Sequence, residues 1–254
     1  MTLADKSYKY MAKSIKFVYG RLRLQFKGYS MNIESDRCNK GLVIAIEGLI
    51  GAGKSTLTNH LCQLCGYTAF NEPVESNPFL VDYYDDPKRW AYAMQVNLLW
   101  ERFRMFQEAT YRALRGEICI ADRSLYGDAA FALVQYKDKY FTDKEFKSYK
   151  TMHETIQPLL PYCDLIIWLE LSPEDTLERI KKRSRTCESN IPIEYLQDLY
   201  EAYQSILKSL EGKCKIVRID AKPEAHCVLC RAMEIIADER VLTSNDNDSL
   251  IRYR

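Results

Sequence analysis

The segment at residues 48–55 (GLIGAGKS) constrains the fold more than any other part of the chain. It matches the pattern G-x-x-x-x-G-K-[ST] and lies between an apolar run at 41–47 and a helical pattern at 55–65. This is the strand–loop–helix context in which the pattern binds phosphate groups. Glycines let the loop curl so that backbone N–H groups point inward, and the helix start adds a positive dipole end. We therefore expect the loop to bind ATP through Gly48, Gly51, Gly53, Lys54, Ser55 and Thr56.

Two side chains of this loop have separate predicted roles. Lys54 is expected to reach the β- and γ-phosphates, where it supplies positive charge. The hydroxyl of Ser55 is expected to ligate Mg²⁺. The sequence thus predicts ATP and Mg²⁺ as cofactors.

From residue 41 onward, short apolar runs alternate with helical patterns. Apolar runs bounded by helices are typical of a parallel sheet that is covered on both faces. We therefore predict an α/β protein with the P-loop kinase fold, in which helices cover both faces of a five-stranded parallel sheet. The expected strands are 41–47, 67–72, 118–121, 164–171 and 213–220. The expected helices are 55–65, 87–115, 125–135, 142–160, 192–210 and two that begin at 173 and about 223.

The ends of the chain differ from this regular part. Residues 1–40 carry nine Lys or Arg and three Asp or Glu, a net charge of +6, although the whole chain has a net charge of only +1. We predict a basic N-terminal arm at 1–40, with a short amphipathic helix between Met11 and Leu22, a catalytic domain at 41–240 and a polar tail at 241–254. The helix is expected to pack on the domain; a membrane surface, an acidic partner or an import receptor are the alternatives.

Charge and cysteine content narrow the location and the partners. A net charge of +1 does not favour nucleic-acid binding, and no apolar run approaches the roughly 20 residues of a membrane span. Nine cysteines in a chain of this size favour a reducing compartment. We expect a cytoplasmic protein, with mitochondria as the alternative, because Asp5 and the scarcity of serine are unlike a transit peptide. Two C-x-x-C pairs, at 62–65 and 227–230, lie within helical patterns and are expected to serve as small apolar residues rather than zinc ligands.

Two polar motifs close neighbouring strands of the predicted sheet. The first is Asn71-Glu72-Pro73-Val74 and the second is Asp122-Arg123-Ser124. Parallel α/β proteins bind ligands at the carboxyl edge of the sheet, where both motifs should lie. There, a carboxylate can take the proton of a bound hydroxyl, and an arginine can hold both the carboxylate and the hydroxyl oxygen.

Five segments together make the chain resemble the deoxyribonucleoside kinase family, over about residues 41–220. They are IEGLIGAGKST (46–56), NEPVESNPFL (71–80), DPKRW (86–90) leading to Gln95, DRSLYGDAAFA (122–132) and RIKKRSRTCESNIPIEYL (179–196). The NPFL segment and the spacing after DRS look most like the bacterial deoxyadenosine/deoxyguanosine kinase branch. The resemblance implies ATP-dependent phosphorylation of a deoxyribonucleoside 5′-hydroxyl, a role in nucleotide salvage, and a homodimer built from helices. In the 93–106 stretch, apolar residues exceed what one core-facing stripe needs, which agrees with a dimer.

The resemblance also implies a role for each matching residue. Glu72 would be the general base for the 5′-hydroxyl, Arg123 would hold that base, and Asp122 would lie near Mg²⁺. Tyr84 and Glu188 would bind the 3′-hydroxyl. The arginines of a lid just after a helix would close on the ATP phosphates; these are Arg179, Arg183 and Arg185.

Base recognition is expected on the long helix at 87–115. Gln95 matches the family's amide that reads the base edge, and Arg102 lies two turns further on the same face. Asp128, on the next helix, can meet Arg102 across the pocket. In the family this pair accompanies purine and deoxycytidine acceptance, so deoxyadenosine or deoxyguanosine is the expected substrate. An ordinary interhelical salt bridge is the alternative interpretation.

Two other functions compete with this one. A nucleoside monophosphate kinase such as thymidylate kinase shares the phosphate loop but needs a cation for the acceptor phosphate, where this chain has the neutral Asn71. A non-catalytic relative should have lost Lys54, Glu72 or Arg123, and all three are present.

Overall fold

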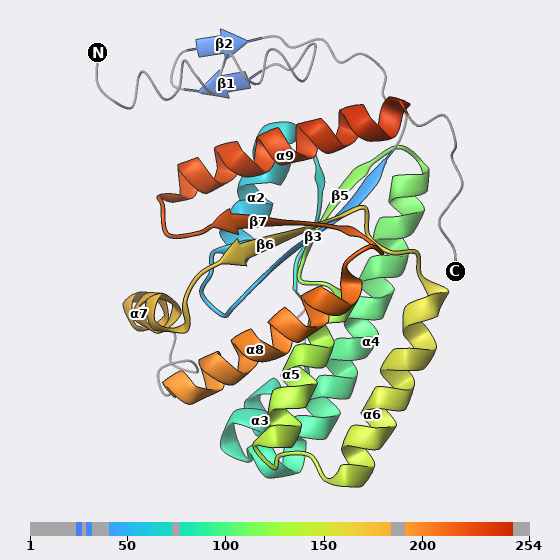
Figure 1. Cartoon of the computed structure of the whole chain (residues 1–254), viewed down its shortest axis with the longest axis vertical. Helices are drawn as coiled ribbons and strands as arrows, with labels where there is room; N and C mark the ends of the chain where they lie inside the picture. The colour runs from blue at the N-terminus through green and yellow to red at the C-terminus, as the bar shows by residue number, and fades with distance from the viewer. Residues whose placement is uncertain (1–23, 27–28, 32–40, 73–76, 184–190, 246–254) are drawn as a thin grey trace.

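The structure is a computed structural model and describes residues 24–26, 29–31, 41–72, 77–183 and 191–245. Its centre is a five-stranded parallel sheet, as predicted, and the order of the strands is β4-β5-β3-β6-β7. The strands are β3 (Leu42–Gly48), β4 (Thr68–Phe70), β5 (Ile118–Asp122), β6 (Leu165–Glu170) and β7 (Lys215–Asp220). β3 holds the middle position, so the loop that follows it opens at the centre of the sheet's carboxyl edge (Figure 1).

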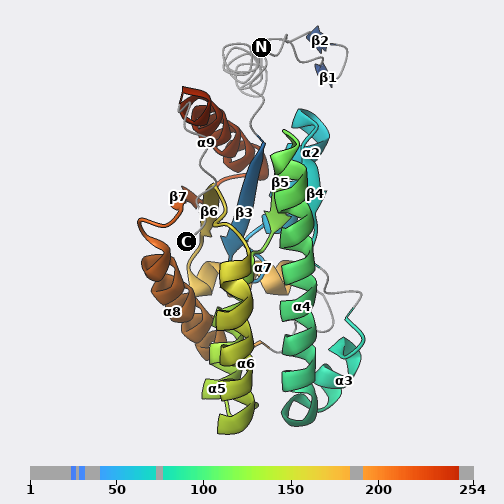
Figure 2. The same cartoon turned by 90° about the vertical axis from the view of Figure 1, so that its right-hand side faces the viewer.

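Helices cover both faces of this sheet (Figures 1 and 2). One face packs against α2 (Lys54–Cys65) and α9 (Ala225–Asn245), and the other against α4 (Pro87–Leu114), α5 (Leu125–Lys137) and α8 (Ile193–Leu210). The layers follow from the alternation of side chains along a strand. In β3, Leu42, Ile44 and Ile46 enter the core under α2 and α9, while Val43 and Ala45 enter the core under α4, α5 and α8.

The starts of the helices follow local capping rules. Asp86 caps α4 by accepting from the N–H of Arg89 and is followed by Pro87 in the first turn. Thr142 and Glu145 form a capping box before α6 (Asp143–Ile156), which continues as the 3₁₀ helix Gln157–Leu159. The capping signals explain why most helix starts could be placed within one or two residues.

Four local features differ from the sequence prediction. A short helix, α3 (Leu80–Asp85), was not predicted; no residue in it is buried, so it lacks the apolar stripe that marks a core-facing helix. Residues 24–31 include the antiparallel strands β1 (Leu24–Phe26) and β2 (Tyr29–Met31), which were not predicted either. α9 continues to Asn245, past the expected start of the tail at 241, because neither Gly nor Pro interrupts it. α7 (Pro173–Arg183) contains Arg179 and Arg183, which the prediction placed just after a helix.

Several sequence predictions fall on residues outside those described. They concern the N-terminal helix between Met11 and Leu22 and the tail beyond Asn245. The division into arm, catalytic domain and tail therefore stays a prediction. Within the described part, the C-x-x-C pairs do lie on helices α2 and α9, and no helix has the length and apolarity required to cross a bilayer.

Candidate active site

The loop after β3 has the backbone of a phosphate cradle. Gly51 and Gly53 adopt φ angles of 83° and 98°, which a residue with a Cβ rarely adopts. The Lys54 ammonium, which is buried, donates to the carbonyl of Leu49 across the loop at 2.9 Å. Burial, reinforced by the nearby positive charge of Arg123, lowers the pKa of Lys54 to about 8. The loop therefore presents a cation whose charge is weakly solvated and available to an anionic ligand.

Ser55 and Asp122 meet at the start of α2, as the sequence predicted. The Ser55 hydroxyl donates to Oδ2 of Asp122 at 2.5 Å. The other oxygen, Oδ1, is buried and has no hydrogen-bond partner among the described residues. A buried carboxylate oxygen without a donor is suited to a cation, and Mg²⁺ takes oxygen ligands. The pair therefore fits a Mg²⁺ ion.

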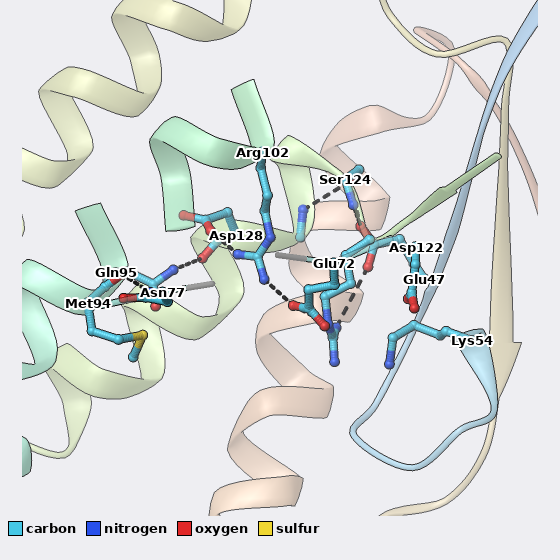
Figure 3. Close-up of polar contacts among 12 residues, drawn as sticks. Glu47, Lys54, Glu72, Asn77, Met94, Gln95, Arg102, Asp122, Ser124 and Asp128 are labelled. Atoms are coloured by element: carbon cyan, nitrogen blue, oxygen red, sulfur yellow. Dashed lines mark hydrogen bonds and ion pairs between the residues drawn. The ribbon is translucent and has the colours of Figure 1, made fainter. Parts of the chain in front are cut away.

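Glu72, two residues after β4, lies between two guanidinium groups (Figure 3). Arg102 donates to Oε1 of Glu72, and Arg123 donates through Nε to Oε2 at 3.0 Å. Burial alone would raise the pKa of Glu72. The positive charges of Arg123, Arg102 and Lys54 outweigh that effect and lower the pKa to about 2. Glu72 is therefore an anion with both oxygens held in place.

Arg123 connects this carboxylate to the phosphate loop. Its Nη1 donates to the carbonyl of Gly48 at 3.1 Å and to the hydroxyl of Tyr203 at 2.6 Å. Its backbone has a φ of 73°, a left-handed conformation that is uncommon for a residue other than glycine. Such outliers persist only where the surroundings fix them, and they gather at functional sites.

The base-recognition residues also come together, on the far side of Glu72. Arg102 pairs with Oδ1 of Asp128, and Tyr149 of α6 donates to Oδ2 of the same carboxylate. Gln95 donates to the backbone carbonyl of Asp128 at 3.3 Å and accepts from Gln135 at 2.9 Å. The predicted contact between Arg102 and Asp128 is thus present, within a larger buried network.

This network is closed in the structure. Gln95, Arg102 and Asp128 are 0%, 1% and 0% exposed. A nucleobase can therefore contact them only when neighbouring side chains move. Arg102 bridges Asp128 and Glu72. A movement of Arg102 would therefore also change the contacts of Glu72.

The remaining predicted residues lie apart from this cluster. Tyr84 of α3 is 45% exposed, and its expected partner Glu188 lies outside the described residues, as does Arg185. Arg183 is exposed in the last turn of α7. Arg179 donates to the backbone carbonyls of Ala52, Ala221 and Lys222, so its guanidinium joins the phosphate loop to the end of β7.

Sequence reasoning missed five polar residues around the site. Asn77 ties the 77–80 segment to α4 by donating to the carbonyl of Met94 at 3.1 Å. A sequence signal existed for two of the others. Glu47 is a charged residue in an otherwise apolar strand, on the same face as Val43 and Ala45, and Gln135 lies two turns after Asp128 on the same face of α5. Tyr149 and Tyr203 gave no local signal, because each reaches the site from a distant segment.

The parallel sheet, the phosphate loop after its central strand and the acidic residue beside it define a P-loop kinase fold. Comparisons with known proteins narrow this class. The deoxynucleoside kinase family model matches residues 44–240. A deoxyadenosine kinase of Dictyostelium discoideum is 37% identical over 181 residues, which cover 71% of this chain and 73% of that protein. A deoxyguanosine kinase of Bacillus subtilis is 33% identical over 174 residues, covering 68% and 82%.

Among solved structures, the deoxyadenosine kinase of M. mycoides with bound dATP matches with a TM-score of 0.66 and 30% identity. The match covers 77% of this chain and 98% of that one. The chain belongs to the deoxynucleoside kinase family. It is a phosphotransferase that phosphorylates a hydroxyl group of a deoxynucleoside.

Proposed function

We propose that this kinase transfers the γ-phosphate of ATP to the 5′-hydroxyl of a purine deoxyribonucleoside, as a step of nucleotide salvage. The observation that carries the proposal is the position of Glu72, which lies between the phosphate loop and the Arg102–Asp128 pair. A nucleoside bound with its base toward Arg102 and Asp128 would direct its sugar toward Glu72. The 5′-hydroxyl would then lie between the carboxylate and the phosphate to be transferred.

On the acceptor side, Glu72 accepts the proton of the 5′-hydroxyl and orients its oxygen. Phosphoryl transfer passes through a loose transition state, so orientation of the nucleophile matters more than strong basicity. The low pKa of Glu72 agrees with this, because the carboxylate is ionised and can accept a hydrogen bond throughout the physiological range. Arg123 holds Glu72 and stabilises the charge that develops on the transferred group.

On the donor side, the backbone N–H groups of residues 48–56 and the Lys54 ammonium bind the phosphates. Ser55 and Asp122 would hold Mg²⁺, which would supply positive charge next to the phosphates when bound. The arginines at the end of α7 and beyond it, Arg183 and Arg185, are proposed to close over the phosphates. Arg179 contributes from beneath, since it supports the loop through the carbonyl of Ala52.

Base preference is proposed to follow from the Arg102–Asp128 pair together with Gln95. A fixed guanidinium can donate to N7 or to a carbonyl, and a carboxylate can accept from an exocyclic amine. The thymine methyl group needs an apolar cavity instead, and the described residues around Asp128 hydrogen-bond to it from two sides. Tyr84 and Glu188 are proposed to bind the 3′-hydroxyl, with Tyr84 crowding the place of a 2′-hydroxyl.

A panel of acceptors tests the proposal. We expect kcat/KM to be highest for deoxyadenosine or deoxyguanosine, lower for deoxycytidine and lowest for thymidine, with ATP and Mg²⁺ present. The nucleoside monophosphate dTMP should not be an acceptor, because Asn71 cannot neutralise its phosphate. The highest kcat/KM for thymidine, or transfer to dTMP, would overturn the assignment.

We also propose a homodimer, although the structure changes the argument for it. Most large apolar residues of the 93–106 stretch are covered within the chain, because α4 packs on both α5 and α6. The exposed apolar residues of α4 are Trp100, Tyr111 and Leu114, at 54%, 57% and 61% exposure. At 100° per residue they share one face of the helix, which a second copy could cover. A monomeric mass in light scattering at micromolar concentration would refute this.

Cytosolic residence is proposed from the sequence of the basic arm, in which Asp5 interrupts the pattern of a transit peptide. Recovery of a protein cleaved near residue 30 from mitochondria would contradict it.

A further inference from the structure

Glu47 is a buried acid that the reaction described above does not use. Along β3, Glu47 is on the same face of the sheet as Val43 and Ala45, the face that α4, α5 and α8 cover. Its side chain is 2% exposed. In each hydrogen bond that Glu47 makes with the described residues, the partner is the donor. The N–H and hydroxyl of Ser124 donate to Oε1 at 2.7 and 2.5 Å, and the hydroxyl of Tyr203 donates to Oε2 at 3.1 Å. Figure 3 shows Glu47 beside Ser124, on the side of Asp122.

The direction of the hydrogen bonds through Tyr203 is fixed by chemistry. A guanidinium can only donate, so Tyr203 accepts from Nη1 of Arg123, at 2.6 Å. The single hydroxyl proton of Tyr203 is then directed to Glu47. With Glu47 ionised, the order Arg123, Tyr203, Glu47 forms a chain in which each hydrogen bond has one direction, and all three side chains are at most 3% exposed.

These hydrogen bonds restrain Arg123. Arg123 has a left-handed backbone, and its guanidinium must present Nε to Glu72 while Nη1 faces the opposite way. Among the described residues, Nη1 donates hydrogen bonds to Tyr203 and to the carbonyl of Gly48, and it also lies 4.0 Å from Oε2 of Glu47. Without Tyr203, one of these two anchors is lost, and the guanidinium can turn away from Glu72.

The space around the side chains of Tyr203 and Glu47 is closely filled. A Cβ placed on Gly127 would lie 2.5 and 2.8 Å from the two carboxylate oxygens of Glu47 and 2.8 Å from the Tyr203 hydroxyl. Such distances are too short for carbon and oxygen in contact, so Gly127 allows α5 to approach Glu47 closely. The same helix is capped by Ser124, which donates to Glu47 while its Oγ accepts from the N–H groups of Tyr126 and Gly127.

We propose that Tyr203 and Glu47 are positioning residues for phosphoryl transfer, which act by orienting Arg123 against Glu72. The inference rests on the roles proposed above for Glu72 and Arg123. Two hydrogen bonds connect α8, the helix that follows residues 184–190, to the carboxylate of Glu72. Arg123 donates one to Tyr203 of α8 and the other to Glu72. In the proposed reaction neither Tyr203 nor Glu47 binds the nucleoside directly, so their removal should lower kcat and leave KM for the nucleoside nearly unchanged.

The same helix supplies a matched control. Tyr200 also donates its hydroxyl to a carboxylate, that of Glu170, at 3.0 Å, and its ring also packs against Trp168. Tyr200 has no contact with Arg123 among those described. The variants Tyr200→Phe and Glu170→Gln therefore make the same chemical changes as Tyr203→Phe and Glu47→Gln, at a tyrosine of the same helix that packs against the same tryptophan.

The experiment measures kcat and nucleoside KM for these four variants, with thermal unfolding as a check on folding. We expect Tyr203→Phe to lower kcat about tenfold. This is less than the roughly 10²-fold loss that a 1 Å misplacement of a catalytic group can cause, because the carbonyl of Gly48 still holds Nη1 of Arg123. Glu47→Gln should act in the same direction, and both control variants should stay within twofold of wild type. In an Arg123→Lys background, Tyr203→Phe should have a smaller effect, because the two changes act through one contact.

Two outcomes would overturn the inference. One is a Tyr203→Phe enzyme with wild-type kcat. The other is an equal loss of kcat in Tyr203→Phe and Tyr200→Phe, which would indicate a general effect on the fold. Glu72→Gln is measured alongside: if that variant keeps full activity, the proposed function fails, whereas an impaired Glu72→Gln with an unimpaired Tyr203→Phe removes only the positioning role.

Discussion

On the phosphate side of the active site, the phosphate loop is made of consecutive residues, 48–55, and only Asp122 and the arginines of residues 179–185 are proposed to join it from elsewhere. The acceptor side, in contrast, gathers Glu72, Gln95, Arg102, Arg123 and Asp128 from four separate segments. The loop binds with backbone groups and one lysine, and its ligand supplies the opposite charge. The acceptor side is an assembly of buried charges that neutralise one another before any ligand arrives. A phosphate needs a charged cradle, while a neutral nucleoside needs a fixed pattern of donors and acceptors.

The difference predicts how each side responds to the loss of a charge. The phosphate side should fail completely when its cation is removed. The acceptor side should respond to the balance of its charges rather than to their number, because a buried charge without a partner is costly.

The largest expected effect comes from Lys54→Ala, which should abolish phosphoryl transfer. No other side chain of residues 48–55 carries charge to the phosphates. Transfer of labelled γ-phosphate to deoxyadenosine, measured at saturating nucleoside, is the test. Activity within tenfold of wild type would contradict the phosphate-cradle assignment.

A second prediction concerns the charge balance on the acceptor side. Arg102→Met or Asp128→Ala alone should lower kcat/KM for every nucleoside by about tenfold or more, because each upsets the balance of buried charge: the first leaves Asp128 without its ion pair, and the second leaves Arg102 with Glu72 alone. The double variant should recover part of the loss and shift preference toward thymidine, since both charges are absent and apolar space is created. Kinetics with the four deoxynucleosides measure this.

The control for the charge-balance prediction is an exposed pair on the same helix, Glu101 and Arg104. Removal of Arg104 should leave kcat/KM nearly unchanged, because exposed ion pairs contribute little. Additive losses in the Arg102 and Asp128 double variant would contradict the balance of charges.

The effect of pH is expected to be the smallest near neutrality and to grow above about pH 8. Burial favours the neutral form of Lys54 and lowers its pKa to about 8, so the cation is present below that pH and lost above it. We expect kcat/KM for ATP to fall above about pH 8, by up to tenfold for each pH unit. Glu72, with a pKa of about 2, should add no acid limb near neutrality. A flat profile up to pH 10 would show that Lys54 keeps its proton in the free enzyme.

The contrast between the two sides also explains how much the sequence could predict. The phosphate side follows from a local motif, and the fold follows from apolar runs and helix caps. The pairing of Glu72 with Arg123 could be predicted because both follow the ends of strands at one edge of the sheet. Helical spacing placed Arg102 and Gln95 on one face, and the resemblance to the family implied Asp128 as the partner of Arg102.

Other contacts depend on packing that no local pattern encodes. Tyr203 reaches Glu47 from 156 residues away, and Tyr149 reaches Asp128 only because α6 lies against α5. Arg179 is expected to bind the ATP phosphates, and no local pattern indicated that it also donates to the backbone carbonyls of Ala52 and Ala221. The apolar surplus on α4 was interpreted as a surface for another chain, and most of it packs against α5 and α6.

The most direct test of the whole account is the turnover of Glu72→Gln. Glutamine keeps the size of the side chain and can still accept through its carbonyl, but it cannot take a proton and leaves Arg102 and Arg123 with less negative charge between them. We predict that kcat falls about 10²-fold or more while the Kd of the nucleoside stays close to that of wild type. Close to full kcat in this variant would contradict the central claim, and Asp122 would then be the next carboxylate to test.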